Sequence, residues 1–131
     1  MPDLETAKLW MKFARDDLSF AKHGLTMRPV PMEIICYHCQ QTAEKAFKSV
    51  LAYYEETIPK THDLAYLLAL CETYNKCVLD LADEAMRLTK YAVAARYPEE
   101  IDILESDMDL ALADAETIFV LIESIYGLHT D

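Results

Sequence analysis

Four polar residues in one helical stretch have the types and spacing to bind an anion. Residues 32–58 contain neither Gly nor Pro, which favours one long helix. At 100° per residue, Gln41, Glu44, Lys45 and Lys48 fall within an arc of about 100°. Lys45 and Lys48, with Gln41, could bind a phosphate, or they could form an ordinary solvated face with Glu44 paired to Lys48 at i,i+4. The opposite side carries residues suited to packing: Cys36, Cys39, Ala43, Ala46, Phe47, Val50 and Tyr54.

Three residues further along the chain could take part in the same chemistry. His62 could hydrogen-bond or titrate near neutral pH, or it could simply cap or pack at the start of a helix. Arg96 offers a bidentate anion donor, and Tyr97 an aromatic surface. Arg96 could equally pair with a carboxylate such as Glu44. Because Pro98 follows two residues later, Arg96 is expected at a helix end, where side chains reach open space.

Three segments, in order, resemble those of the HEPN domain family of small all-helical proteins. Residues 37–48, Tyr-His-Cys-Gln-Gln-Thr-Ala-Glu-Lys-Ala-Phe-Lys, resemble the signature helix of the family. Residues 60–64, Lys-Thr-His-Asp-Leu, are similar to its Thr-His-Asp-Leu helix start, and residues 95–98, Ala-Arg-Tyr-Pro, to its Arg-Tyr-Pro segment. With Trp10 and residues 16–18, Asp-Asp-Leu, the resemblance covers nearly the whole chain.

The resemblance implies a non-catalytic member of the family. Some HEPN relatives are metal-independent ribonucleases of toxin–antitoxin and defence systems, in which four to six residues separate an Arg from the His that follows it. In this chain no His follows Arg96 until His129, and no other Arg has a His at that spacing. What the resemblance implies instead is a domain that binds a nucleotide or RNA phosphate, or that works as the partner of a minimal nucleotidyltransferase in a toxin–antitoxin type system.

We predict that Lys45, Lys48, His62 and Arg96 converge on one polar groove. Glu44 is expected among them as a counter-charge, because several cations near one another repel. The set of candidate nucleotide- or phosphate-binding residues is Gln41, Glu44, Lys45, Lys48, His62, Arg96 and Tyr97. No catalytic residue, cofactor or metal is expected.

Two alternative functions stay open at this point. One is a metal-independent ribonuclease that uses Arg96, Tyr97 and His62. The other is a purely structural protein–protein interaction module, which would neutralise a basic partner with its acidic C-terminal face. In each case a homodimer is expected, since relatives pair around a two-fold axis, with Tyr91 and Tyr97 at the interface.

Composition sets the broad class of the protein. A chain of 131 residues with 53% hydrophobic residues is expected to form a single HEPN-like domain over residues 1–131. The net charge is −11, and residues 99–131 contain ten acidic residues and no Lys or Arg, so nonspecific nucleic-acid binding is disfavoured. No run of 18 uncharged apolar residues exists, so we expect no membrane contact and a cytoplasmic location.

The four cysteines allow a redox or metal interpretation. Cys36 and Cys39 have the CxxC spacing of a redox pair or half a zinc site. Both also fall on the packing side of their helix, where Cys is a common small hydrophobic residue. Cys71 and Cys77 are six positions apart, which suits no standard zinc half-site.

Apolar periodicity predicts an up-and-down bundle of four longer helices and one short helix. The long helices are expected at about 4–25, 32–56, 79–95 and 106–126, and the short one begins at Thr61 or His62 and ends near Thr73. Asp3 and Thr61 are expected as N-caps, Ser106 with Asp109 as a capping box, and Gly127 as a C-cap. The residues of the last helix expected to face inward are Leu110, Ala113, Ile118, Leu121 and Ile125.

Overall fold

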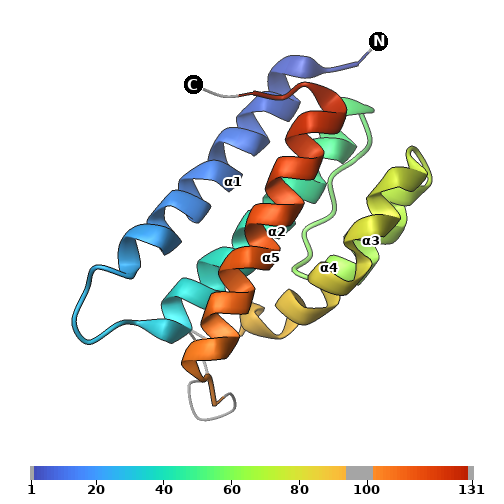
Figure 1. Ribbon diagram of the computed structural model, residues 1–131. Coiled ribbons are helices and arrows are strands. Elements are labelled where there is room, and N and C mark those ends of the chain that lie inside the picture. Colours follow the sequence, from blue (N-terminus) through green and yellow to red (C-terminus); the bar gives the residue numbers. More distant parts are fainter. Residues whose placement is uncertain (1, 94–101, 130–131) are drawn as a thin grey trace.

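The computed structural model describes residues 2–93 and 102–129. Within these residues the chain is all-α, as predicted, and contains no strand. The five α-helices are α1 (Leu4–Gly24), α2 (Met32–Tyr53), α3 (Leu64–Glu72), α4 (Ala82–Leu88) and α5 (Glu105–Tyr126). The long helices α1, α2 and α5 lie side by side, and α3 and α4 lie along one side of them (Figure 1).

Helix α1 packs closely on α2 because its buried stripe is made largely of small residues. Asp3 caps the helix as predicted, accepting a hydrogen bond from the Thr6 backbone N–H at 3.1 Å. The buried residues of α1 are Ala7, Met11, Ala14, Leu18, Ala21 and Gly24. Gly24 lies very close to Ile35: a Cβ atom at position 24 would lie 2.9 Å from the Cγ1 atom of Ile35. Small side chains thus bring the two backbones together.

Helix α2 is the central element, because it packs against α1, α3, α4 and α5. Its side chains are buried on almost every side between Cys39 and Ala52. Phe47 is among the largest side chains with no exposed surface. The polar residues of α2 therefore lie inside the bundle together with the apolar ones, and this decides the character of the candidate site.

The predicted helix at 79–95 is wrong in its bounds. Helical winding begins earlier, in the 3-10 segment η1 (Lys76–Leu81), because the Asn75 side chain accepts a hydrogen bond from the Cys77 N–H at 2.9 Å. Helix α4 then spans only Ala82–Leu88 and continues into the 3-10 segment η2 (Thr89–Ala92). Arg87 in α4 forms two 2.8 Å hydrogen bonds with Asp114, which fasten α4 to α5.

Helix α5 buries a stripe that matches the predicted one only in part: Ile118 is buried as expected, whereas Leu110 and Ala113 are not. It begins at Glu105, with the Asp107 carboxylate accepting from the Leu104 N–H at 2.9 Å, rather than at Ser106. Leu110 is 46% exposed, and Ala113 is also exposed. The buried stripe instead contains Met108, Ala111, Asp114, Ala115, Ile118, Phe119 and Ile122. The helix is turned so that Asp114 faces Arg87. The C-cap at Gly127 is confirmed, with φ at 62°.

The second helix ends earlier than predicted, in a left-handed turn at Glu55. The Glu56 N–H donates to the Leu51 carbonyl at 2.9 Å, and the Glu55 N–H to the Ala52 carbonyl at 3.0 Å. This is the bonding pattern of a Schellman motif. Glu55 occupies its left-handed position with φ at 60°, where glycine is usual. The chain therefore leaves the helix axis before it reaches Pro59.

Replacing Glu55 with glycine is expected to stabilise the fold by about 0.5–1 kcal/mol. A left-handed non-glycine residue costs about 1–2 kcal/mol, and the extra freedom of glycine in the unfolded chain offsets part of the gain. The melting temperature should rise by about 2–5 °C, measured by thermal unfolding. Glu55→Ala keeps the strain and removes the charge, so it should not give this increase. An equal rise in both variants would place the effect in the charge instead.

Helix α3 begins at Leu64, with Asp63 rather than Thr61 as its N-cap. The Asp63 carboxylate accepts from the backbone N–H groups of Ala65 and Tyr66 at 3.0 and 3.2 Å. Thr61 accepts from the Asp63 N–H at 3.1 Å and so supports the cap from outside the helix. His62 consequently lies in the connection before α3, beside α2.

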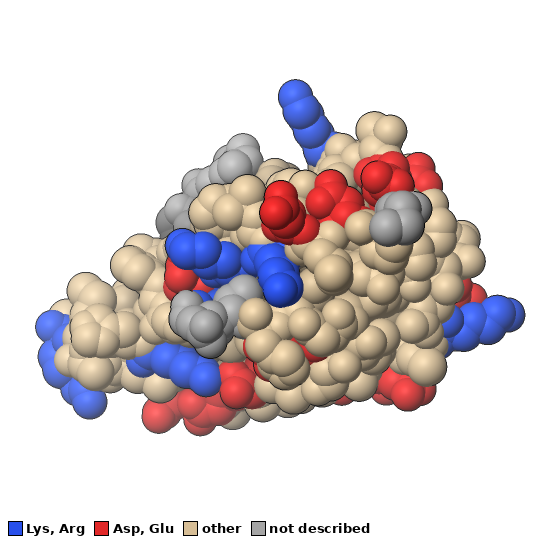
Figure 2. Space-filling model, turned by 90° about the horizontal axis from the view of Figure 1, so that it is seen from above, with Lys and Arg blue, Asp and Glu red and all other residues tan. Residues whose placement is uncertain are grey.

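The start of α1 lies at the same end of the bundle as the ends of α2 and α5 (Figure 1). On the face in Figure 2, Lys and Arg side chains lie in several separate places with Asp and Glu between them. Among residues 2–93 and 102–129, no helix combines the length and apolar character needed to cross a membrane.

Candidate functional site at the polar face of α2

The polar face of α2 is mostly buried and is not the solvated helix face that the sequence alone allows. Gln40, Gln41, Glu44 and Lys48 are 0%, 8%, 4% and 7% exposed. The physical reason is the central position of α2, which is covered by α1 on one side and by the start of α3 on another. Buried polar groups need hydrogen-bond partners, and these residues form a connected network.

Glu44 is the centre of the first cluster, which we call the Glu44 cluster: Gln40, Gln41, Glu44, Lys48 and His62. One carboxylate oxygen, Oε1, lies 2.7 Å from His62 Nδ1 and accepts from both glutamine amides at 3.3 Å. The other, Oε2, accepts from Lys48 Nζ at 3.0 Å. Gln40 also donates to the His62 carbonyl at 3.1 Å. The cluster therefore fastens the start of α3 to α2.

Glu44 takes the position predicted for it, between Lys48 and His62. The Lys48 side chain is only 9% exposed, and its ammonium group lies 5.8 Å from the centre of the Trp10 ring. The His62 side chain, in contrast, is 54% exposed. An incoming anion would thus meet His62 first, whereas Lys48 is already neutralised and covered.

Lys45 belongs to a second cluster, which we call the Asp17 cluster: Asp17, His38 and Lys45. Asp17 Oδ2 accepts from Lys45 Nζ at 2.6 Å, and Oδ1 lies 2.8 Å from His38 Nδ1. Lys45 and Lys48, which are expected to line one polar groove, thus each pair with a different carboxylate. Helix α1 supplies Asp17, and the distribution of polar residues on α2 alone could not reveal it.

Sequence reasoning missed His38 and Asp17 as functional candidates. His38 lies between Cys36 and Cys39, and it precedes Lys45 by seven residues, or about two helical turns, so the two side chains share a face of the helix. The seven-residue spacing could therefore have identified His38 as a candidate site residue beside Lys45. Asp17 gave no such signal, because its contact depends on how α1 packs on α2.

The Glu44 cluster and the Asp17 cluster have the same arrangement of a carboxylate, a histidine and a lysine. In each, one carboxylate oxygen holds a histidine at Nδ1 and the other holds a lysine ammonium group. A carboxylate at Nδ1 fixes the orientation of an imidazole and leaves Nε2 for a ligand or a proton transfer. The side chain of His62 is more accessible than that of His38, which is 24% exposed and whose ring centre lies 4.8 Å from that of Phe20.

Two predicted site residues, Arg96 and Tyr97, lie outside the described residues. The predicted convergence of Arg96 on the groove therefore stays a prediction. Tyr91, expected at a dimer interface, is 4% exposed, so it belongs to the core and offers almost no surface to a second chain. Burial raises the pKa of its hydroxyl to about 12.

The cysteines of the CxxC segment have a packing role. Cys36, Cys39 and Cys71 are buried, whereas Cys77 is exposed. Burial raises the pKa of the Cys36 and Cys71 thiols to about 12 and shifts that of Cys39 in the same direction. A reactive or metal-binding cysteine needs a lowered thiol pKa. In the part of the chain that the structure describes, no group of three or more His, Cys, Asp or Glu residues is placed to hold a metal ion.

Comparisons with known proteins agree with this fold. A model of the HEPN domain matches residues 7–125. A protein of Methanocaldococcus jannaschii named "Putative toxin MJ1304" is 28% identical over 146 aligned positions, which cover 96% of this chain and 94% of that protein. The crystal structure of TT1696 from Thermus thermophilus superposes with a TM-score of 0.78 and 26% identity, covering 90% of this chain and 96% of that one.

Proposed function

Since the chain belongs to the HEPN domain family, we propose a function in two parts. The first is that the chain is the toxin-type component of a two-protein system. The second is that it binds the phosphate of a nucleotide or RNA at the polar face of α2. Similarity over 96% of the chain to a protein whose name describes a toxin supports the first part. The observation that carries the second part is His62, whose side chain is 54% exposed and is held at Nδ1 by the buried Glu44.

The charge balance of the two clusters supports anion binding at the histidines rather than at the lysines. In each cluster one carboxylate and one ammonium group cancel, so protonation of the histidine leaves a net charge of about +1. A phosphate oxygen that accepts from Nε2 of His62 would meet this charge without breaking the ion pair between Glu44 and Lys48. Since the chain as a whole carries a charge of −11, such binding must be local and not driven by a long-range field.

Substituting His62 with alanine is expected to weaken binding of ATP or a short single-stranded RNA by about 10–100-fold. That range corresponds to the loss of one charge-assisted hydrogen bond of about 1.5–3 kcal/mol. Isothermal titration calorimetry at fixed low salt measures the effect. His23→Ala is the matched control, because His23 is exposed at the end of α1, away from Glu44. Equal affinities of both variants and the unchanged protein would contradict the assignment of His62.

The second protein of the proposed system is a minimal nucleotidyltransferase, as the family resemblance implies. Expression of the chain alone should arrest bacterial growth, and co-expression of a minimal nucleotidyltransferase partner should restore growth. The two proteins should also elute together from a sizing column. Absence of both the growth arrest and the co-elution would reject the two-protein system. The expected homodimer stays a prediction, to be measured by light scattering.

A metal-independent ribonuclease is the second candidate, and the two carboxylate–histidine pairs favour it. An imidazole oriented by a carboxylate could accept the proton of a 2′-hydroxyl group, and an adjacent cation could stabilise the transition state. The Arg–His spacing of the family's ribonucleases is nevertheless missing after Arg96. We therefore expect the purified protein to leave RNA intact in the presence of a chelator. Cleavage that is lost in His62→Ala or His38→Ala would establish the second candidate instead.

A further inference from the structure

An apolar pocket of about 160 Å³ lies between the end of α1 and the start of α2. We call it the Phe20 pocket. Helix α1 lines it with Phe20, Ala21 and Gly24, and helix α2 lines it with Ile34, Ile35 and His38. Because His38 also belongs to the Asp17 cluster, the pocket places apolar side chains directly beside a polar group whose orientation is fixed.

The Phe20 pocket forms because the buried side of α1 carries only small residues at this point. Ala21 is fully buried and Gly24 has no side chain, so neither fills the space in front of α2. The larger side chains of Phe20 and Ile34 lie at the rim instead, where they are 62% and 46% exposed. The result is a hollow with apolar walls and an open mouth, which is the usual form of a small-molecule site.

The size and the walls of the pocket suit one aromatic ring. An apolar protein cavity of about 150 Å³ is large enough to bind benzene, and the Phe20 pocket is of that size. The Phe20 and His38 ring centres lie 4.8 Å apart with their planes tilted by 51°, so a third ring can meet one edge-on and the other face-on. Met27, a further lining residue, adds a thioether, which makes favourable contacts with aromatic rings.

His38 favours a ring that carries a hydroxyl group. Its Nδ1 atom lies 2.8 Å from Asp17 Oδ1, and Lys45 occupies the other oxygen of that carboxylate at 2.6 Å. This arrangement leaves the Nε2 atom of His38 for a ligand. A phenolic hydroxyl both donates and accepts hydrogen bonds, so it can pair with Nε2 whether the imidazole is neutral or protonated.

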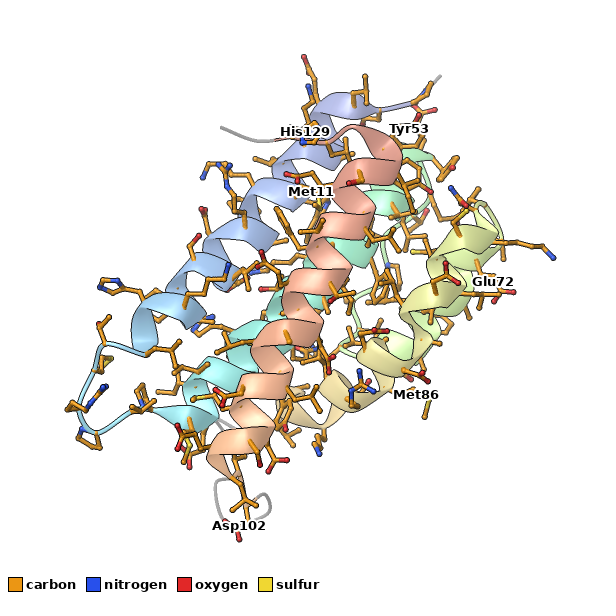
Figure 3. The ribbon with its side chains drawn as sticks, viewed as in Figure 1. Met11, Tyr53, Glu72, Met86, Asp102 and His129 are labelled. Atoms are coloured by element: carbon orange, nitrogen blue, oxygen red, sulfur yellow. The ribbon has the colours of Figure 1, made fainter. Side chains whose placement is uncertain are left out.

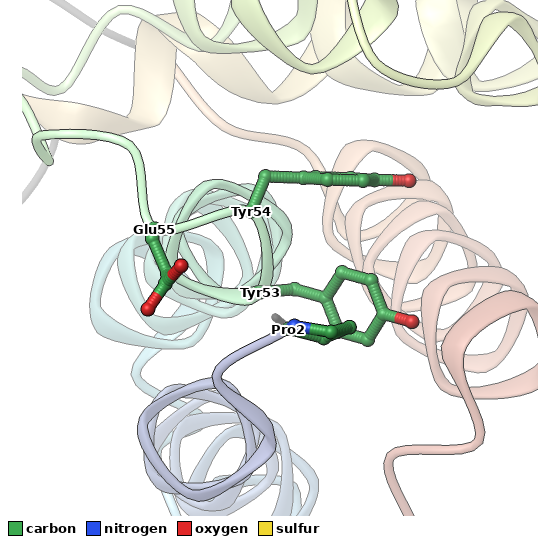
Figure 4. A pocket seen from close by; sticks show the side chains of 4 residues that line it. All are labelled: Pro2, Tyr53, Tyr54 and Glu55. Carbon is green, nitrogen blue, oxygen red and sulfur yellow. The ribbon is translucent and has the colours of Figure 1, made fainter.

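A larger pocket of about 370 Å³, at the opposite ends of α1 and α2, lacks this combination. Tyr53, one of its lining residues, is labelled at that end of the bundle in Figure 3. In Figure 4 the Glu55 side chain extends to one side of the end of α2, and the Tyr53 and Tyr54 rings extend to the other. The carboxylate and the rings there do not face a common ligand, whereas the Phe20 and His38 rings lie side by side.

We propose that the Phe20 pocket binds a single phenolic ring, with the ring against Phe20 and the hydroxyl group on His38 Nε2. Such a ring can come from a free small phenol or from a tyrosine side chain of a protein. The inference goes beyond the proposed phosphate site at His62. Each site has its own ligand and its own variants, so either can fail without the other.

The proposal is tested by following backbone amide resonances while phenol is added to the full chain. We expect saturable shifts centred on residues 20–24 and 34–38. Cyclohexanol, which keeps the hydroxyl on a ring that is not aromatic, should bind about 3–10-fold more weakly. Absence of saturable shifts at these residues, or equal affinities for phenol and cyclohexanol, would overturn the proposal.

The ring contact is tested with two phenylalanine variants of α1. Phe20→Ala should weaken phenol binding by about 3–10-fold, and it should keep the fold because the side chain is mostly exposed. Phe13→Ala is the matched control, since Phe13 is 44% exposed on the same helix and is not among the lining residues. Equal losses in the two variants would contradict a site at Phe20.

The hydroxyl contact is tested with toluene, which has the ring without the hydroxyl group. His38→Phe should weaken binding of phenol by about 3–10-fold, the loss of one hydrogen bond, and should leave binding of toluene unchanged. An equal change for both compounds would show that Nε2 does not hold the hydroxyl group. N-acetyltyrosine amide identifies the source of the ring: tighter binding than phenol would indicate a tyrosine of a protein, and weaker binding a free phenol.

Discussion

Replacing Glu44 with leucine is expected to destabilise the protein by about 3–5 kcal/mol. Glu44 is 4% exposed and accepts hydrogen bonds from Lys48 and both neighbouring glutamines, and it also holds His62. Without it, the ammonium group of Lys48 stays buried with no opposite charge. Breaking a buried pair by removing one partner has a cost of this size. Chemical denaturation at neutral pH measures the change in the free energy of unfolding.

Two companion variants test the cause of that loss. Glu44→Leu with Lys48→Met removes both charges, and we expect it to recover most of the stability, since apolar replacement of a whole buried pair is often neutral. Asp16→Ala breaks the ion pair between Asp16 and Lys12, in which the Lys12 side chain is 54% exposed and the Asp16 side chain 58% exposed. This variant should lower the free energy of unfolding by less than about 1 kcal/mol. If the double variant is no more stable than Glu44→Leu, the unpaired lysine is not the cause.

The free energy of unfolding is expected to fall steeply as the pH rises above about 9. Burial raises the pKa of Cys36 and Cys71 to about 12, and that of Cys39 also upward, from an ordinary thiol value of 9.0. Below pH 9 these thiols are protonated in both states, so stability is unaffected. Above pH 9 the thiols lose their protons in the unfolded chain but keep them in the folded protein. The free energy of unfolding therefore falls until the pH reaches the pKa of the folded-state thiols, near 12 for Cys36 and Cys71. Each thiol adds about 1.4 kcal/mol per pH unit to the slope.

Cysteine variants separate this effect from other alkaline changes. Cys71→Ala should make the slope of unfolding free energy between pH 9 and 10 shallower by up to about 1.4 kcal/mol per pH unit. Cys77→Ala should leave it unchanged, because Cys77 is exposed. Denaturant melts at several pH values give the slopes. Equal slopes in the two variants would mean that the buried thiols do not govern alkaline stability.

The sequence by itself determined the features that depend on neighbouring residues in one helix. Asp3 and Gly127 are caps as expected. The pair of Glu44 and Lys48 also follows from i,i+4 spacing on one helix. These features arise from local geometry, which the order of residues fixes.

Only the tertiary structure decided which polar residues are buried and which carboxylate each cation contacts. Gln41, Glu44 and Lys48 look like a solvated face on an isolated helix, yet packing of α1 and α3 around α2 covers them. Lys45 pairs with Asp17, 28 residues earlier in the chain, because α1 lies beside α2. Helix α5 turns Asp114 towards Arg87 and leaves Leu110 outside. These outcomes depend on how whole helices pack together, and periodicity within one helix carries no information on its neighbours.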